Sequence, residues 1–175
     1  MCIRDRWGTG YDTTVRSFVN IIATPKGGTH VQGFEQGLLR AFSAGLEGTR
    51  ILKSSEEIVK DDVLEGMTAV VTVSLAEPQF EGQTKEVLGT PPVRRLVARI
   101  VEDKMTAFLT SAKAADKPVA RALMEKVVNA SRTRVAARAH KENQRRKNAL
   151  ESSHLPPKLK DCLLYTSDAA DERSS

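Results

Sequence analysis

The chain has 175 residues, enough for one domain with a buried core, and 40% of them are hydrophobic and 28% charged. It contains no apolar run long enough to cross a bilayer, which excludes a membrane-spanning protein, and its N-terminus lacks the apolar core of a secretory signal. Cys2 and Cys162 lie at opposite ends without metal-type spacing, so we expect a reducing cytoplasm and no metal site, and the net charge of +5 suggests a polyanionic partner without naming one.

Both ends of the chain differ from their neighbours in periodicity and composition. Residues 1–6 read MCIRDR and residues 163–172 read LLYTSDAADE, and both stretches are similar to translated sequencing-adapter read-through. We therefore expect residues 1–6 and 163–175 to be non-native tails that take no part in the fold. The basic character of the chain belongs to the residues between them.

The first half of the interior predicts a strand followed by a helix. Arg16–Thr24 is apolar and β-branched and runs into Pro25-Lys26-Gly27-Gly28, which indicates a buried strand that ends in a tight turn. A helix is predicted from Thr29, whose hydroxyl would form a capping box with Gln32, to near Gly48. Its apolar face has three- and four-residue spacing and consists of Val31, Phe34, Leu38, Leu39, Phe42 and Leu46.

The middle of the chain predicts a short helical turn around Asp61–Glu65 and then a strand over Met67–Leu75. Apolar and polar residues alternate in that strand, which is typical of a sheet covered on one side only. Pro78–Gly89 has no periodicity and is predicted to be a loop. Thr90 is predicted to cap the next helix, with Pro91 at its first position.

The last predicted helix is long and alanine-rich and runs from Pro118 to about Leu150. One face of this helix is apolar in its first part and basic in its later part. This pattern predicts a helix whose first part packs on the domain and whose later part is more exposed to solvent. This face contains Leu123, Val127, Ala130, Arg134, Arg138, Lys141 and Arg145. The order strand, helix, strand, helix, helix predicts an α/β sandwich of one sheet and one helical layer.

The predicted loop carries the motif PQFEGQTK at residues 78–85. Gly82 permits a sharp backbone path, and Gln83 and Lys85 are long polar side chains that can point the same way on an extended segment. A lysine ammonium suits a terminal phosphate, and a glutamine amide can share the same cluster of oxygens. On composition alone, a solvated loop lysine is the more common interpretation.

The PQFEGQTK motif closely resembles one in the transducer domain of the ATPase subunit of bacterial type II DNA topoisomerases, the gyrase B and topoisomerase IV class. Other stretches resemble family segments in the same order, so the resemblance covers about Trp7–Cys162. These stretches are Ser17-Phe18-Val19-Asn20, Gly27-Gly28-Thr29-His30, Asp62-Val63-Leu64-Glu65-Gly66 and residues 145–162.

The resemblance implies an α/β two-layer sandwich of the ribosomal-S5-domain-2-like transducer type, followed by a long C-terminal helix. It also implies a left-handed βαβ crossover, although connection rules alone favour the right-handed one. The transducer domain would occupy residues 7–152 without its first strands. Residues 153–162 would be a linker toward an absent magnesium-binding module.

In the family, the glutamine and lysine of this motif contact the γ-phosphate of ATP in the neighbouring site. The resemblance therefore implies that Gln83 and Lys85 bind the cofactor and that Lys85 is catalytic. ATP with Mg²⁺ would be bound mainly by domains absent from this chain, which has no Walker-type loop to replace them. We expect the chain alone to be inactive in ATP hydrolysis.

Basic residues gather near the end of the last predicted helix: Arg132, Arg134, Arg138, Lys141, Arg145, Arg146 and Lys147. In the family, the transducer domains of two subunits enclose a cavity that passes DNA, which makes Arg134, Arg138, Lys141 and Arg145 DNA-facing candidates. A solvated helix face is the alternative of equal weight. No aromatic residue lies among the basic ones, which argues against single-strand binding.

The resemblance thus implies part of a cytoplasmic, ATP-dependent isomerase, either gyrase or topoisomerase IV. Its partners would be DNA, the DNA-cleaving subunit and a second copy of the ATPase subunit, with no membrane. The alternative is a stand-alone basic nucleic-acid-binding or oligomerisation module without nucleotide sensing. Three other residues are interpreted structurally: Trp7 and His30 as packing or capping residues, and Asp62 as an acid in the first turn of a helix.

Overall fold

The computed structural model describes residues 1–47, 49, 51–52, 56–111 and 113–151 of the chain. The predicted linker and C-terminal tail lie outside the described residues. The chain forms one compact unit over Met1–Arg134 and a second unit from Val135 onward. In chain order the elements are β1 (Cys2–Trp7), β2 (Thr14–Val19), β3 (Ile22–Ala23), α1 (Thr29–Glu47), α2 (Lys60–Leu64), β4 (Met67–Val73), α3 (Pro91–Leu109) and α4 (Asp116–Glu151).

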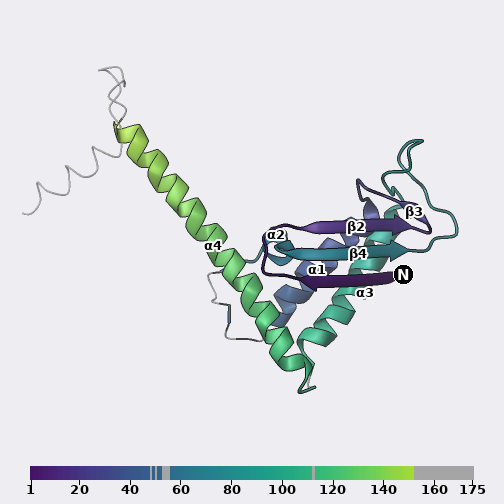
Figure 1. Cartoon of the computed structure of the whole chain (residues 1–175), viewed down its shortest axis with the longest axis horizontal. Helices are drawn as coiled ribbons and strands as arrows, with labels where there is room; N and C mark the ends of the chain where they lie inside the picture. Colours follow the sequence, from purple (N-terminus) through teal and green to yellow (C-terminus); the bar gives the residue numbers. More distant parts are fainter. Residues whose placement is uncertain (48, 50, 53–55, 112, 152–175) are drawn as a thin grey trace, which may run out of the picture. The chain divides into compact units, whose positions relative to one another are not determined.

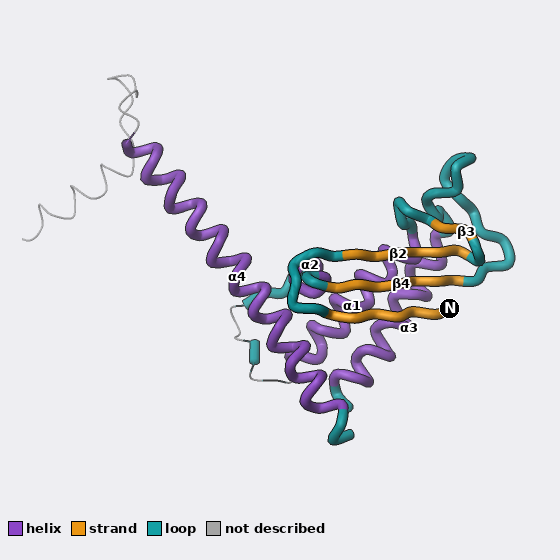
Figure 2. The backbone as a smooth tube through the Cα atoms, viewed as in Figure 1, coloured by secondary structure: helices purple, strands orange, loops and turns teal. Residues whose placement is uncertain are grey.

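The sheet has the strand order β1-β4-β2-β3, in which β2 and β4 are parallel and the other pairs are antiparallel. Helices α1 and α3 cover one face of this sheet, which confirms the predicted two-layer sandwich (Figures 1 and 2). The connection from β2 to β4 passes through α1 behind the sheet in the view of Figure 1, so the crossover is left-handed, as the resemblance implied.

The core lies between α1 and β4. The predicted alternation in β4 is confirmed, because Met67, Ala69, Val71 and Val73 are buried while Thr68 and Val70 are exposed. The buried α1 residues that face them are Phe34, Leu38, Phe42 and Leu46. Truncating one such large residue to alanine costs about 2–5 kcal/mol, so this interface holds the unit together.

Glycines allow α1 and α3 to pack in close contact. A Cβ atom at Gly33 would lie 2.4 Å from the carbonyl oxygen of Arg94, and one at Gly37 would lie 2.5 Å from that of Ala98. A glycine inside a helix costs about 1 kcal/mol relative to alanine. Here that cost is offset by the close approach of the two helices.

The predicted strand over Arg16–Thr24 is wrong in extent, because the chain turns back at Asn20 and forms a hairpin of β2 and β3. Asn20 has a φ of 56°, a left-handed conformation that asparagine tolerates better than most residues. Its amide exchanges two hydrogen bonds with the backbone of Leu75, at 3.0 and 3.1 Å. An apolar run does not reveal such a reversal, because both halves remain hydrophobic.

Strand β1 corrects the expectation that residues 1–6 take no part in the fold. It pairs with β4 along its whole length, from Cys2 opposite Thr72 to Trp7 opposite Met67. The backbone of a sheet edge accepts almost any extended segment, so the charged sequence of this strand does not prevent pairing. The origin of these residues stays a prediction.

The predicted packing role of Trp7 is confirmed. Its indole Nε1 donates a hydrogen bond to the carbonyl oxygen of Val63 at 2.9 Å, and its ring meets that of Phe42 edge-on at 6.1 Å.

Two predicted helix caps are also corrected. The hydroxyl of Thr29 is buried and has no partner among the described residues, so the expected capping box with Gln32 does not form. Thr90 stands at the N-cap position of α3, as predicted, but its hydroxyl accepts a hydrogen bond from the backbone N–H of Gln79 at 3.0 Å and makes no capping bond to the helix. Pro91 stands at the first position of α3, as predicted.

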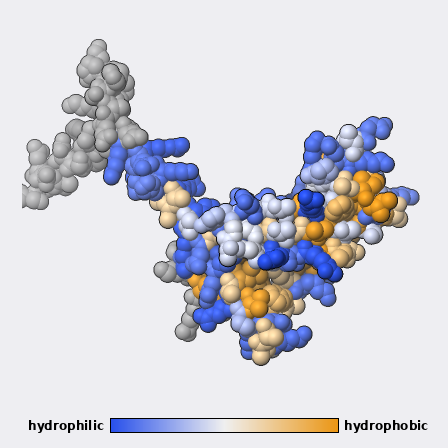
Figure 3. All heavy atoms as spheres, in the orientation of Figure 1, coloured by the Kyte–Doolittle hydropathy of each residue, from blue (hydrophilic) through white to orange (hydrophobic). Residues whose placement is uncertain are grey.

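Helix α4 changes character along its length, as its strip of apolar and basic residues predicts. Its buried residues belong to the first unit: Ala120, Met124, Val127, Val128, Ala130 and Ser131. From Val135 to Lys147 every side chain is exposed. Hydrophilic side chains dominate this part of the helix (Figure 3).

Candidate functional site

The PQFEGQTK motif lies in a hairpin-like loop between β4 and α3. Its two arms are joined by hydrogen bonds from Glu81 N–H to the carbonyl of Val87 at 3.0 Å and from Gly89 N–H to that of Gln79 at 2.8 Å. The tip of the loop is residues 82–85, here named the QTK turn. Gly82 has a φ of 84°, which fits the predicted sharp backbone path.

The QTK turn is not the extended segment that the sequence suggested. Gln83 and Thr84 form a turn, the N–H of Lys85 donates to the carbonyl of Gly82 at 3.4 Å, and Lys85 has a φ of 55°. A left-handed conformation costs a residue other than glycine roughly 1–2 kcal/mol, and such strain is concentrated at functional sites. The side chains of Gln83 and Lys85 are both exposed.

The base of this loop is fastened to the turn at residues 25–28, which leads into α1. Leu88 is fully buried, its N–H donates to the carbonyl of Gly27 at 3.1 Å, and its carbonyl accepts from the N–H of Thr29 at 2.9 Å. A Cβ atom at Gly28 would lie 2.4 Å from the nitrogen of Leu88, so only glycine fits there. Two motifs that are far apart in the sequence are therefore in direct contact.

An ion pair that the sequence did not suggest lies beside the QTK turn. The ammonium of Lys26 is 2.6 Å from Oε2 of Glu86, and the hydroxyl of Thr84 donates to the same oxygen at 3.4 Å. The hydrogen bond from Lys26 lowers the pKa of the Glu86 carboxyl. Lys85 itself makes no ion pair within the part of the chain that the structure describes.

His30 is enclosed by the core, which fits the packing role predicted for it. Its Nε2 is 3.3 Å from the hydroxyl of Thr24, which is in turn 2.8 Å from that of Ser17. Burial lowers the pKa of His30 to about 4, so the ring is neutral at physiological pH. Its Nδ1 has no partner among the described residues.

The structure separates the basic residues of α4 into two groups. Arg134 forms a two-pronged ion pair with Asp62, at 2.8 and 3.0 Å, and Arg132 pairs with Glu56 at 2.8 Å. The hydrogen bond to Asp62 raises the pKa of Arg134. These two arginines therefore fasten α4 to residues 56–62 of its own unit, an arrangement that the sequence analysis missed.

The second group extends along the exposed part of α4. Arg138, Lys141 and Arg145 are exposed, and no ion pair joins any of them to another described residue. Arg146, which was not a candidate, pairs with Glu142 at 3.4 Å. Three of the four predicted DNA-facing side chains are thus accessible, whereas the fourth, Arg134, is already paired with Asp62.

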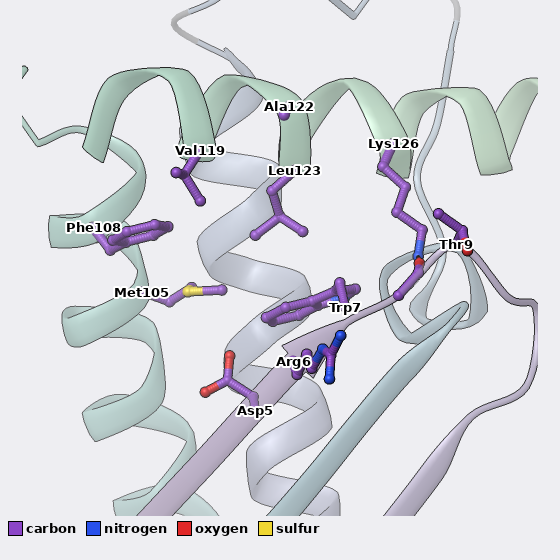
Figure 4. Close-up of a pocket in the computed structure, with 11 residues that line it drawn as sticks. Asp5, Arg6, Trp7, Thr9, Met105, Phe108, Val119, Ala122, Leu123 and Lys126 are labelled. Carbon is purple, nitrogen blue, oxygen red and sulfur yellow. The ribbon is translucent and has the colours of Figure 1, made fainter. Parts of the chain in front are cut away.

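A cavity of about 850 Å³ lies between β1, α3 and the first turns of α4 (Figure 4). Its lining is mainly apolar and includes Trp7, Met105 and Leu123. At its rim, the ammonium of Lys126 donates to the carbonyls of Gly8 and Glu65, and partial desolvation beside the cavity raises the pKa of Asp5, although that residue is exposed. None of the predicted site residues lines this cavity.

The described residues contain no group of three His, Cys, Asp or Glu side chains that could hold a metal ion. Within the same residues, no helix has the length and apolar character that crossing a membrane requires.

The chain is similar in sequence to the B component of bacterial DNA gyrases. The sequence profile of the DNA gyrase B family matches residues 1–143. DNA gyrase B of Borrelia hermsii is 41% identical over 158 residues, and that of Streptococcus pyogenes serotype M1 is 42% identical over 158 residues. Both alignments cover 90% of this chain and 24% of the relative, so the chain spans about a quarter of the length of these proteins.

Solved structures share the fold. The 43K ATPase domain of Thermus thermophilus gyrase B, in complex with an aminocoumarin, matches with a TM-score of 0.69 and 30% identity over 80% of this chain and 37% of that domain. The topoisomerase IV ATP-binding domain of Francisella tularensis matches with a TM-score of 0.66 and 30% identity over 76% of this chain and 36% of that one.

Proposed function

Because this chain belongs to the DNA gyrase B family, we propose that it serves as the transducer domain of the ATPase subunit of a type II DNA topoisomerase. In this role it senses the terminal phosphate of ATP and couples hydrolysis to DNA strand passage. The observation that carries the proposal is the QTK turn, which presents an exposed ammonium and amide on a loop whose base is fixed to the core.

The residues of the QTK turn fit a phosphate group. The exposed ammonium of Lys85 has no ion-pair partner among the described residues and can bind a phosphate oxygen, while the amide of Gln83 can donate to a neighbouring oxygen. ATP with Mg²⁺, held mainly by another domain of the subunit, would supply the terminal phosphate. Two opposite unit charges about 4 Å apart attract each other by roughly 1 kcal/mol in water and by roughly 4 kcal/mol at the effective dielectric constant near a protein surface. Lys85 is therefore the catalytic candidate of this chain.

Because the base of the loop is hydrogen-bonded to the turn at residues 25–28, a movement of the loop can be transmitted to α1. Among the described residues Lys85 has no anionic partner, so a contact with the phosphate exists only while the phosphate is bound and can bias the balance between two domain orientations. Leu88 links the base of the loop to the turn that begins α1. Because α1 and α3 are in close contact at Gly33 and Gly37, we infer that they move together with the loop.

We propose that DNA is the polyanionic partner and that it is contacted by the exposed part of α4. Arg138, Lys141 and Arg145 are accessible there, and phosphate contacts of this kind are independent of sequence and weaken with salt. Arg134 is the weaker candidate because Asp62 already engages its guanidinium.

The remaining partners follow from the family. We propose a cytoplasmic homodimer of the ATPase subunit that works with the DNA-cleaving subunit of gyrase or topoisomerase IV. The exposed basic stretch also favours a second candidate, a stand-alone nucleic-acid-binding module without nucleotide sensing. Deleting residues 135–147 would abolish every function of such a module, whereas changing Lys85 would leave it unaffected.

The proposal is tested by Lys85→Ala in the full-length subunit that carries this segment. We expect ATP turnover to fall by at least about fivefold while binding of a non-hydrolysable ATP analogue is largely kept, because the lost charge contact of roughly 1 to 4 kcal/mol acts mainly on the cleavage step. Lys104→Ala, which removes an exposed α3 lysine without an ion pair among the described residues, is the matched control and should turn over normally. Normal turnover by Lys85→Ala would refute the proposal.

A further inference from the structure

Glu86 follows Lys85 directly in the chain, so a carboxylate lies next to the ammonium that the proposed function requires. In the structure, this carboxylate forms an ion pair with a different lysine: its Oε2 is 2.6 Å from the ammonium of Lys26. The backbone N–H of Lys26 also donates to the carbonyl of Glu86 at 3.3 Å. Glu86 is thus attached to the turn at residues 25–28 through both its main chain and its side chain.

This attachment matters for electrostatic reasons. A neighbouring carboxylate without a partner would compete with phosphate oxygens for the ammonium of Lys85, and at contact distance salt screens such competition only partly. The cation of Lys26 neutralises the carboxylate where it stands. Among the described residues, Glu86 therefore has a cationic partner and Lys85 has no anionic one.

We propose that Lys26 is a positioning residue for Lys85: it holds the Glu86 carboxylate against the turn at residues 25–28 and thereby leaves the Lys85 ammonium available to phosphate. This inference rests on the proposed function, since it assigns Lys26 a role in the same site. Lys26 acts through Glu86 and does not itself touch the nucleotide.

The role of the Lys26 ammonium is separable from the stability of the loop. Leu88 is fully buried, and its backbone bonds to Gly27 and Thr29 hold the loop base without the Lys26 side chain. The ammonium of Lys26 is itself well exposed, with 68% of its side chain accessible. Lys26→Met should therefore change the partner of Glu86 and not the fold.

The first experiment measures ATP turnover of the full-length subunit with Lys26→Met, Glu86→Gln and both changes together. We expect Lys26→Met to lower kcat/KM about two- to fivefold, because the Glu86 carboxylate then pairs with the Lys85 ammonium and competes with the phosphate. This factor corresponds to the free energy of an exposed ion pair. Glu86→Gln alone should stay within about twofold of the parent. The double variant should recover the parent value, because it has no carboxylate left to compete.

Each outcome distinguishes between interpretations. A merely structural Lys26 would leave the double variant as impaired as the single one, and that result, or a normal Lys26→Met, would overturn the inference. Lys85→Ala is measured in the same series. If it is inactive while Lys26→Met is normal, only the role of Lys26 fails, whereas full turnover by Lys85→Ala removes the proposed function itself.

A second experiment uses the present chain and follows the Glu86 carboxyl carbon by NMR during a pH titration. The pKa of Glu86 should lie below its ordinary value of 4.5 in the parent. It should stay low in Lys26→Met, because Lys85 takes over as partner, and rise toward the ordinary value only in Lys26→Met/Lys85→Met, in which the hydrogen bond from Thr84 is the cause that still lowers it. A rise in Lys26→Met alone as large as that in Lys26→Met/Lys85→Met would show that the released carboxylate does not reach Lys85, which overturns the inference.

Discussion

Among the described residues, the ion pair between Arg134 and Asp62 is the most buried one that α4 makes, and Arg134→Met tests its contribution to stability. The Asp62 side chain is only 3% exposed, and its two oxygens accept from Arg134 at 2.8 and 3.0 Å. Methionine keeps most of the aliphatic stem and removes the guanidinium. The carboxylate of Asp62 would then stay buried, and its remaining partner among the described residues would be the backbone N–H of Val59, at 3.0 Å.

The expected cost follows from this burial. Removing one partner of a fully buried ion pair costs about 3–5 kcal/mol. Because 35% of the Arg134 side chain is exposed, we expect Arg134→Met to lower the free energy of unfolding by roughly 2–3 kcal/mol. Asp62→Asn keeps the volume and a hydrogen-bonding side chain, so its cost should be about 1 kcal/mol. The double variant should cost about 1–2 kcal/mol less than the sum, since no buried charge remains.

The assay is urea unfolding of the chain at neutral pH, followed by the helical signal in circular dichroism. Arg121→Met is the matched control, because Arg121 pairs with Glu125 at 2.8 Å but 73% of its side chain is exposed. That control should cost no more than about 0.5 kcal/mol. Equal losses for Arg134→Met and Arg121→Met, or strict additivity in the double variant, would show that the buried pair does not fasten α4.

Gly37→Ala should cost more than about 2 kcal/mol, since its Cβ would meet a carbonyl oxygen at 2.5 Å, and an alanine that is tolerated would mean that the helices separate readily. Burial lowers the pKa of His30 from 6.5 to about 4, so the unfolded chain takes up its proton first and stability should fall as pH drops across that window, whereas His30→Gln should lack that part of the loss. Arg138→Gln and Arg145→Gln should each weaken binding of the chain to duplex DNA and reduce the slope of log K against log salt by about 1, and an unchanged slope would remove that residue from the DNA contact.

Most helices and the central strand were predictable from local patterns. The three- and four-residue spacing in α1 and the alternation in β4 arise because one face of each element is buried, and that constraint is visible in the residues themselves. The hairpin at Asn20 and the edge strand β1 were missed. Strand β1 is held by its backbone pairing with β4, and the turn at Asn20 by its N–H bond to the carbonyl of Val73 and by its side-chain bonds to the backbone of Leu75; such bonds leave no mark on hydropathy.

For the candidate site, the sequence by itself determined which side chains are present: an amide and an ammonium on a glycine-containing turn, and a run of basic residues late in a helix. Only the tertiary structure decided what surrounds them. It brought Lys26 to Glu86 and engaged Arg134 with Asp62, in each case across about sixty or more residues of sequence. The physical reason is that charge pairing depends on distances between atoms, which a chain acquires only when its elements pack together.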